Sequence, residues 1–216
     1  LVFQEPLDQL LPRIFLLAVE LGEFGVPGQQ QLGLDLDQRR RHVDELGTEL
    51  DIHLRRLIHE GESHAVALAR ATDCWAQAAQ AAQRAGVTYC IEPLSADQTP
   101  VVNTLAQATA IVQSVNHPHL RTMLDTSSAG LAESVPLPDL IDQWFPTGWV
   151  AHVQLNDPNR RGPGQGTMAF GPILAALKRQ GYKGPMAVEP FDYVPDGLGC
   201  AARAAGYLQG LWEQLA

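Results

Sequence analysis

Four oxygen-bearing side chains recur at the ends of short apolar runs between residues 87 and 189 of this 216-residue chain. Glu92 and Glu189 each end a run and each precede a proline, while Asp125 and Gln154 end two runs between them. Carboxylate and amide oxygens, with no thiolate among them, are the ligands that hard divalent cations prefer. The pattern predicts one bound cation, Mn2+ or Mg2+ first and Co2+ next, although any one of these acids alone would more simply cap a strand end in solvent.

The spacing of these residues is roughly 30 positions, the length of one strand–helix unit. Apolar runs and helical periodicities alternate from residue 87 onward, which indicates βα units and a parallel sheet. Expected strands span 87–92, 120–125, 149–155 and 184–189, and expected helices cover 104–116, 137–145, a segment from about 172 to before 181, and 198–215. Parallel strands end on one side of a sheet, and in a (β/α)8 TIM barrel that side holds the active site. The predicted fold class is therefore α/β of the TIM-barrel type.

The first part of the chain fits this scheme poorly. Residues 13–21 are compatible with a strand and residues 62–85 with one Ala-rich helix, but the stretch between them is polar and charged. A full barrel needs about 250 residues. We therefore predict a single TIM-barrel-like domain over 1–216, in which 87–216 carries the metal site and 1–86 is divergent or truncated. The strand edges of an incomplete barrel would be covered by the helix at 62–85 or by a second copy of the chain, which makes a homo-oligomer possible.

The segment around Gln154 suggests how a substrate is held. A Gly- and Pro-rich loop follows the strand and contains Arg160. An arginine beside a metal can clamp substrate oxygens, and glycines let the backbone approach them, although the same composition is typical of a surface turn. His152 lies two residues before Gln154 and shares its strand face. It is either a partner below the metal or, as we slightly favour, a core histidine.

The composition of the chain limits the kinds of molecule that it is expected to bind. The formal net charge is −9, which disfavours general binding to nucleic acid or to an anionic membrane surface. The apolar run at 14–19 is too short to span a bilayer. Three cysteines, odd in number and set among apolar residues, indicate reduced thiols in a cytoplasmic protein. The expected partner is a small molecule.

The motifs CIEPLS, LDTSSAG, HVQLNDPNRRGPGQG and GPMAVEPFDY, all in the last 130 or so residues, resemble those of the sugar phosphate isomerase/epimerase superfamily, the xylose isomerase-like TIM barrels. The resemblance to its ketose 3-epimerases and hydroxypyruvate isomerases implies that Glu92, Asp125, Gln154 and Glu189 bind one divalent metal. It also implies that the two glutamates are the acid/base pair and that Arg160 contacts substrate. Where the epimerases carry a histidine three residues after the metal aspartate, this chain has Ser128, a candidate substrate contact.

This resemblance implies proton transfer through a cis-enediolate on a ketose or hydroxy-carbonyl sugar, with a metal polarising the carbonyl and one glutamate removing the neighbouring proton. Three alternatives stay open. The chain could be a lyase or C-glycoside-cleaving enzyme on a 3-keto sugar. It could be a metal-dependent abasic-site endonuclease, which the acidic charge disfavours. It could also be a non-catalytic, incomplete barrel.

Overall fold

The computed structural model describes residues 2–3, 58 and 61–215. The expected strand at 13–21 and the polar stretch that follows it lie outside these residues. Thus the prediction for the N-terminal part of the domain can be compared with the structure only at its two ends. No helix within the described ranges combines the length and the apolar character needed to cross a membrane.

A five-stranded sheet forms the centre of the molecule, in the order β1-β5-β4-β3-β2. The strands are β1 (Val2–Phe3), β2 (Tyr89–Ile91), β3 (Leu120–Asp125), β4 (Val150–Gln154) and β5 (Met186–Ala187). Strands β2 to β5 run parallel, and β1 pairs antiparallel with β5. The register places Asp125 opposite Gln154 and Gln154 opposite Ala187. The parallel sheet expected from 87 onward is therefore present, with all four carboxyl ends on one side.

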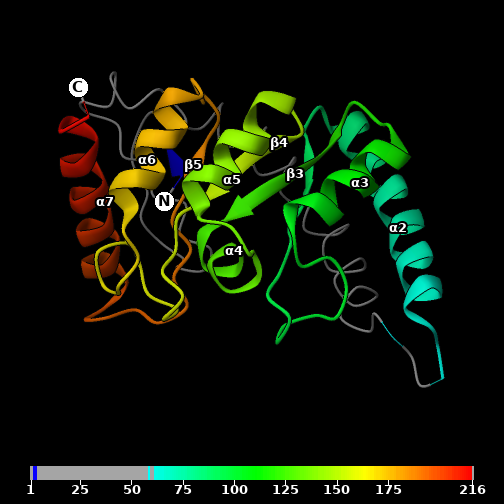
Figure 1. Cartoon of the computed structure of the whole chain (residues 1–216), viewed down its shortest axis with the longest axis horizontal. Coiled ribbons are helices and arrows are strands. Elements are labelled where there is room, and N and C mark those ends of the chain that lie inside the picture. Colours follow the sequence, from blue (N-terminus) through cyan, green and yellow to red (C-terminus); the bar gives the residue numbers. More distant parts are fainter. Residues whose placement is uncertain (1, 4–57, 59–60, 216) are drawn as a thin grey trace, which may run out of the picture.

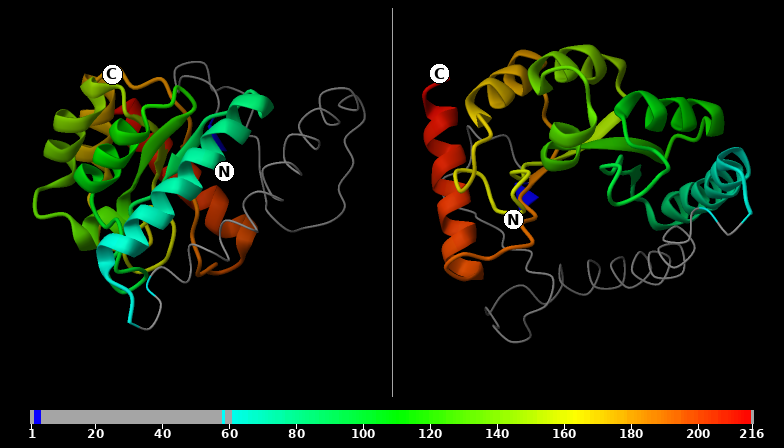
Figure 2. Two further views of the ribbon diagram at one scale, coloured as in Figure 1. Left: turned by 90° about the vertical axis from the view of Figure 1, so that its right-hand side faces the viewer. Right: turned by 60° about the horizontal axis from the view of Figure 1, so that its bottom comes forward.

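Helices lie along the outside of this sheet. In chain order they are α2 (His64–Ala85), α3 (Leu105–Val115), α4 (Thr126–Ala132), α5 (Leu137–Trp144), α6 (Phe170–Arg179) and α7 (Gly197–Glu213), with the 3-10 helix η2 (Phe145–Thr147) after α5. Helices α2, α3, α5, α6 and α7 follow one another along an arc with the strands on its inner side, as the right-hand view of Figure 2 shows. The short helix α4 instead lies at the tip of β3 (Figure 1). This arrangement is a segment of a βα barrel.

Local sequence explains where the helices begin and end. Ser63 caps α2 by accepting a hydrogen bond from the Val66 N–H, and Gly86 ends that helix in the left-handed conformation that glycine adopts without strain. At α3, Thr104 and Gln107 form a reciprocal capping box. These caps set the residues at which the helices begin and end, and thus where the chain turns toward or away from the sheet.

Two apolar clusters hold the helices against the strands. One joins α5, α6 and α7 to β4 and β5 around Phe170 and Val153, and the other joins α2 and α3 to β2 around Trp75 and Ile91. Side chains alternate across a strand, so residues flanking Val153 point to the opposite face. Gln154 and His152 therefore lie on the inner, concave face of the sheet, and Gln154 lies at the carboxyl end, the side on which a TIM barrel holds its active site.

Candidate active site

Asp125 has two roles at the end of β3. It is the last residue of the strand and also the N-cap of α4, because its Oδ1 accepts a hydrogen bond of 2.8 Å from the Ser128 N–H. Its Oδ2 accepts a second bond of 2.7 Å from Asn156 Nδ2. Burial raises the pKa of Asp125, and the hydrogen bonds from Ser128 and Asn156 oppose that rise. The carboxylate is thus held in one orientation from two sides.

Glu92 and Glu189 extend the negative cluster on either side of Asp125. Glu92 follows β2, is half-buried, and has its pKa raised to about 8, first by desolvation and then by the charges of Asp125 and Glu189. Glu189 lies two residues beyond β5 and is more exposed, and its pKa is raised by desolvation and by Asp125. The pKa of Glu92 is thus affected by both other carboxyl groups, and that of Glu189 by Asp125.

Gln154 completes the set at the end of β4. Its side chain donates a hydrogen bond to Glu189, which lowers the pKa of that carboxyl. Its Oε1 is buried and has no hydrogen-bond partner. A buried amide oxygen without a donor is costly, at about 1–3 kcal/mol, unless something else satisfies it. An electropositive group bound next to this oxygen would do so.

A divalent cation fits this site by the chemistry of its donors. Three mutually repelling carboxyls and an unsatisfied amide oxygen are what a hard cation neutralises and satisfies. In the described part of the chain, however, no group of three or more His, Cys, Asp or Glu side chains is arranged so that it could hold a metal ion. The hydrogen bond from Gln154 to Glu189 is one contact that binding would have to replace. Metal ligation by these four residues therefore stays a prediction.

His152 and Ser128, the two other candidate substrate contacts, have different surroundings. Burial lowers the pKa of His152, while a hydrogen bond to the backbone of Pro185 raises it. Pro185 directly precedes Met186, which pairs with Val153, so this bond ties the imidazole to the neighbouring segment of the sheet. That contact favours the interpretation of His152 as a core histidine. Ser128 lies in the first turn of α4, and its residue is buried beside Asp125. Substrate contact by His152 and Ser128 stays a prediction.

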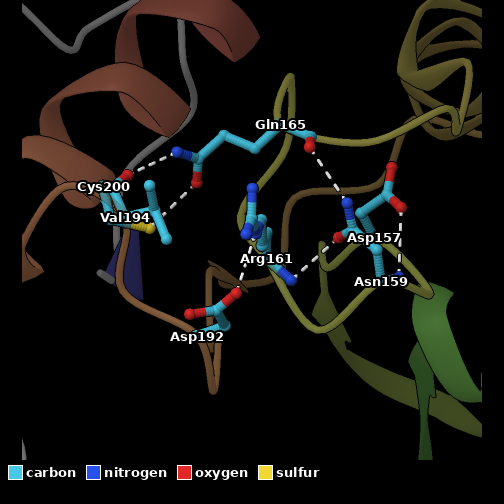
Figure 3. Close-up of polar contacts among 7 residues, drawn as sticks. All are labelled: Asp157, Asn159, Arg161, Gln165, Asp192, Val194 and Cys200. Atoms are coloured by element: carbon cyan, nitrogen blue, oxygen red, sulfur yellow. Dashed lines mark hydrogen bonds and ion pairs between the residues drawn. The ribbon is translucent and has the colours of Figure 1, made fainter.

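Arg160 takes part in contacts that join the loop after β4 to the loop after β5. Its carbonyl accepts hydrogen bonds of 2.9 Å from the backbone N–H groups of both Phe191 and Asp192, and its guanidinium stacks 5.0 Å from the centre of the Phe191 ring. Next to it, Arg161 Nε donates to Asp192 Oδ2 at 2.8 Å (Figure 3). These contacts hold the exposed Arg160 side chain beside the residues that follow Glu189. Its role as a substrate clamp stays a prediction.

The glycines of this loop have a structural role that the sequence did not reveal. A Cβ on Gly166 would overlap the carboxylate of Asp157, and one on Gly164, which has a φ of 80°, would meet the Tyr207 ring at 2.8 Å. Asp157 is fully buried, and its carboxylate accepts bonds from the backbone N–H groups of Asn159 and Met168. The glycines therefore let the loop close over a buried carboxylate and pack against α7.

Two residues near the site were missed from the sequence. Asn156 and Asp157 belong to an Asn-Asp-Pro-Asn run that is typical of a surface turn. Both are in fact buried and hydrogen-bonded, and Asn156 contacts Asp125 directly. Two polar residues directly after the buried strand residue Leu155 were the one signal of this in the sequence.

The family model of the xylose isomerase-like TIM barrel matches residues 32–211. The chain belongs to this family. A solved structure of an L-ribulose 3-epimerase superposes with a TM-score of 0.66 at 19% identity, covering 82% of this chain and 68% of the other, which shows the shared fold. The fold class predicted from the βα spacing and the family suggested by the motifs are thereby confirmed.

Two curated relatives of this family member are sugar epimerases. A D-psicose 3-epimerase of Ruminiclostridium cellulolyticum is 29% identical over 124 residues, which are 56% of this chain and 41% of the relative. A 3-dehydro-D-guloside 4-epimerase of Escherichia coli is 28% identical over 110 residues, 51% of this chain and 41% of the relative. The chain thus spans about two fifths of the length of each of these two proteins.

Proposed function

We propose that this xylose isomerase-like protein is a divalent-metal-dependent sugar epimerase or isomerase that moves a proton next to a carbonyl through a cis-enediolate. The observation that carries the proposal is that the pKa of Glu92 is raised by the charges of Asp125 and Glu189 at the carboxyl edge of the sheet, where the amide oxygen of Gln154 is buried without a hydrogen-bond partner. The kinship with sugar epimerases supports the reaction class.

The two glutamates are the proposed proton carriers. Glu92 and Glu189 follow two different strands, β2 and β5, so their carboxylates can approach a sugar from two directions, one removing a proton and the other returning it. Pro93 and Pro190 follow them and restrict each glutamate to extended backbone conformations. Proton return to the opposite face of the same carbon gives epimerisation, and return to the neighbouring carbon exchanges aldose and ketose.

The proposed cation, Mn2+ or Mg2+, would be held by Glu92, Asp125, Gln154 and Glu189 and would polarise the substrate carbonyl when bound. Arg160 is the proposed clamp for a substrate oxygen, since its backbone is fixed by the loop after β5. Asp125 has both oxygens engaged by N–H donors, which suits an orienting ligand better than a proton carrier.

The substrate class has two candidates. Similarity to a D-psicose 3-epimerase supports a free ketose as the substrate, whereas similarity to a 3-dehydro-D-guloside 4-epimerase supports a glycoside that carries a keto group. Both need a C–H bond next to a carbonyl, so the same residues serve either reaction. Comparing turnover of a ketohexose with that of a 3-keto glycoside separates them. A lyase on the 3-keto sugar would be recognised by release of the aglycone, and an inert protein by turnover of neither.

Metal binding has a measurable effect on stability. A cation that binds only the folded state raises the melting temperature, by about 2.7 kcal/mol of stabilisation at one hundred times its dissociation constant. We expect the protein to bind about one Mn2+ per chain by calorimetry and to melt several degrees higher with Mn2+ than with chelator. Glu189→Gln should weaken both effects. Equal melting temperatures in the two conditions would contradict the cation site.

The reaction itself is tested by isotope exchange. A proton carried on a glutamate exchanges with solvent when it is released before its return. In D2O with Mn2+, a ketose or keto glycoside that is turned over should therefore gain deuterium at the carbon next to the carbonyl, measured by NMR or mass spectrometry. Turnover without any deuterium in the product would indicate a hydride shift or a shielded internal transfer, and would remove the solvent-exchanging step from the mechanism.

A further inference from the structure

The side chain of Asn156 links two of the three carboxyl-bearing residues by hydrogen bonds. It lies two residues beyond the end of β4 and is only 2% exposed. Its Nδ2 donates to Asp125 Oδ2 at 2.7 Å, and its Oδ1 accepts from the Glu189 N–H at 2.7 Å. A carboxylate can only accept and a backbone N–H can only donate, so the chemistry of the two partners fixes the orientation of the amide.

The backbone of Asn156 is anchored as firmly as its side chain. The hydroxyl of Thr126, the first residue of α4, donates to the Asn156 carbonyl at 2.7 Å and accepts from the Asn156 N–H at 2.8 Å. Thr126 is fully buried. This pair continues the contact between β3 and β4 by one step past the last paired residues, Asp125 and Gln154. The asparagine amide therefore has little freedom to follow a carboxylate that moves.

One side chain thus bridges two strands that are not neighbours. Strand β4 lies between β3 and β5 in the sheet. Asp125 is the last residue of β3, and Glu189 lies two residues after the end of β5. Asn156 holds the carboxylate of the first and the backbone of the second. Its burial means that a sugar at the mouth does not reach it, so any effect on the reaction passes through the residues it holds.

We propose that Asn156 is a positioning residue that sets the distance between the Asp125 carboxylate and Glu189, and thereby shapes the cation site and the placement of one proton carrier. This inference rests on the proposed function. Partners that orient a metal ligand typically affect metal affinity or activity by about 10–100-fold.

The test is Asn156→Leu, which keeps the branched shape and removes both side-chain hydrogen bonds without adding charge. We expect Mn2+ affinity, measured by calorimetry, to fall by about 10–100-fold, and kcat to fall with little change in KM. The matched control is Asn103→Leu. Asn103 donates two side-chain hydrogen bonds, to the Leu94 and Thr99 carbonyls, in the loop after β2. It should lower the melting temperature in chelator and leave Mn2+ affinity unchanged.

The outcomes separate this inference from the function on which it rests. A wild-type protein that binds no Mn2+ and turns over no sugar contradicts the proposed function and the role of Asn156 with it. An active wild type together with an unchanged Mn2+ affinity and kcat in folded Asn156→Leu overturns the positioning role alone. If that variant does not fold, Thr126→Val removes the hydroxyl that anchors Asn156. It should weaken Mn2+ binding several-fold, and unchanged binding there overturns the inference.

Discussion

Replacing Glu92 or Glu189 by glutamine is expected to reduce turnover by roughly a hundredfold or more, because a positioned acid or base contributes about 10²–10⁴-fold to a proton transfer. Glutamine keeps the size of the side chain and one oxygen that can contact a cation, but it cannot carry the proton. The measurement is kcat for the best sugar substrate, taken across a Mn2+ titration for each variant and for the wild type.

The Mn2+ titration distinguishes the two roles proposed for these glutamates. Turnover that recovers when Mn2+ is raised to saturation would assign the residue to metal binding only. A loss that persists at saturation would assign it to proton transfer. Glu213→Gln is the control, because it makes the same change of charge at an exposed position near the end of α7. Wild-type turnover in both active-site variants would remove the acid/base assignment.

The sequence predicted the carboxyl edge of the sheet well because its strands are marked by strong local signals. The run LRTMLD forms β3 with the expected bounds, Leu120–Asp125, and its final residue pairs with Gln154 as the spacing indicated. Strand β5 is shorter than the expected 184–189. Pro185 directly precedes it and has no N–H to donate to a strand ladder, and beyond it the Glu189 N–H donates to the Asn156 side chain, so only Met186–Ala187 is paired as a strand. Glu189 nevertheless reaches the site from the segment beyond.

Other features have no local signal and could not be predicted. Helix α4 covers Thr126–Ala132, a short run without an apolar period, and its first turn is capped by the Asp125 side chain. Asn156 is buried by partners about 30 residues away on each side, which a reading of its neighbours cannot reveal. Strand β1 pairs antiparallel with β5 through Val2 and Phe3, which lie far along the sequence from the alternating strands and helices that begin at residue 87.

The metal-free protein is expected to lose stability as the pH rises from about 4.5 to about 8. In this window the folded state holds a proton on Glu92, whose pKa is raised from 4.5 to about 8, while the unfolded chain has released it. Because the folded state binds more protons than the unfolded state in this window, the free energy of unfolding falls as the pH rises. Asp125 and Glu189, whose pKa values are also raised, act in the same direction. Solvent contact at Glu189 screens its share, and we assign the larger effect to the half-buried Glu92.

Glu92→Gln should therefore be more stable than the wild type in chelator at pH 8, by on the order of 3 kcal/mol, and should match it near pH 4.5. Urea unfolding at several pH values measures this difference, with Glu213→Gln as the control for a lost exposed charge. The same substitution is expected to abolish most turnover, so one glutamate would destabilise the empty fold and serve the reaction. A wild-type stability in chelator that does not fall between pH 4.5 and pH 8, or a Glu92→Gln curve parallel to it, would show that the three carboxyls do not share a desolvated site.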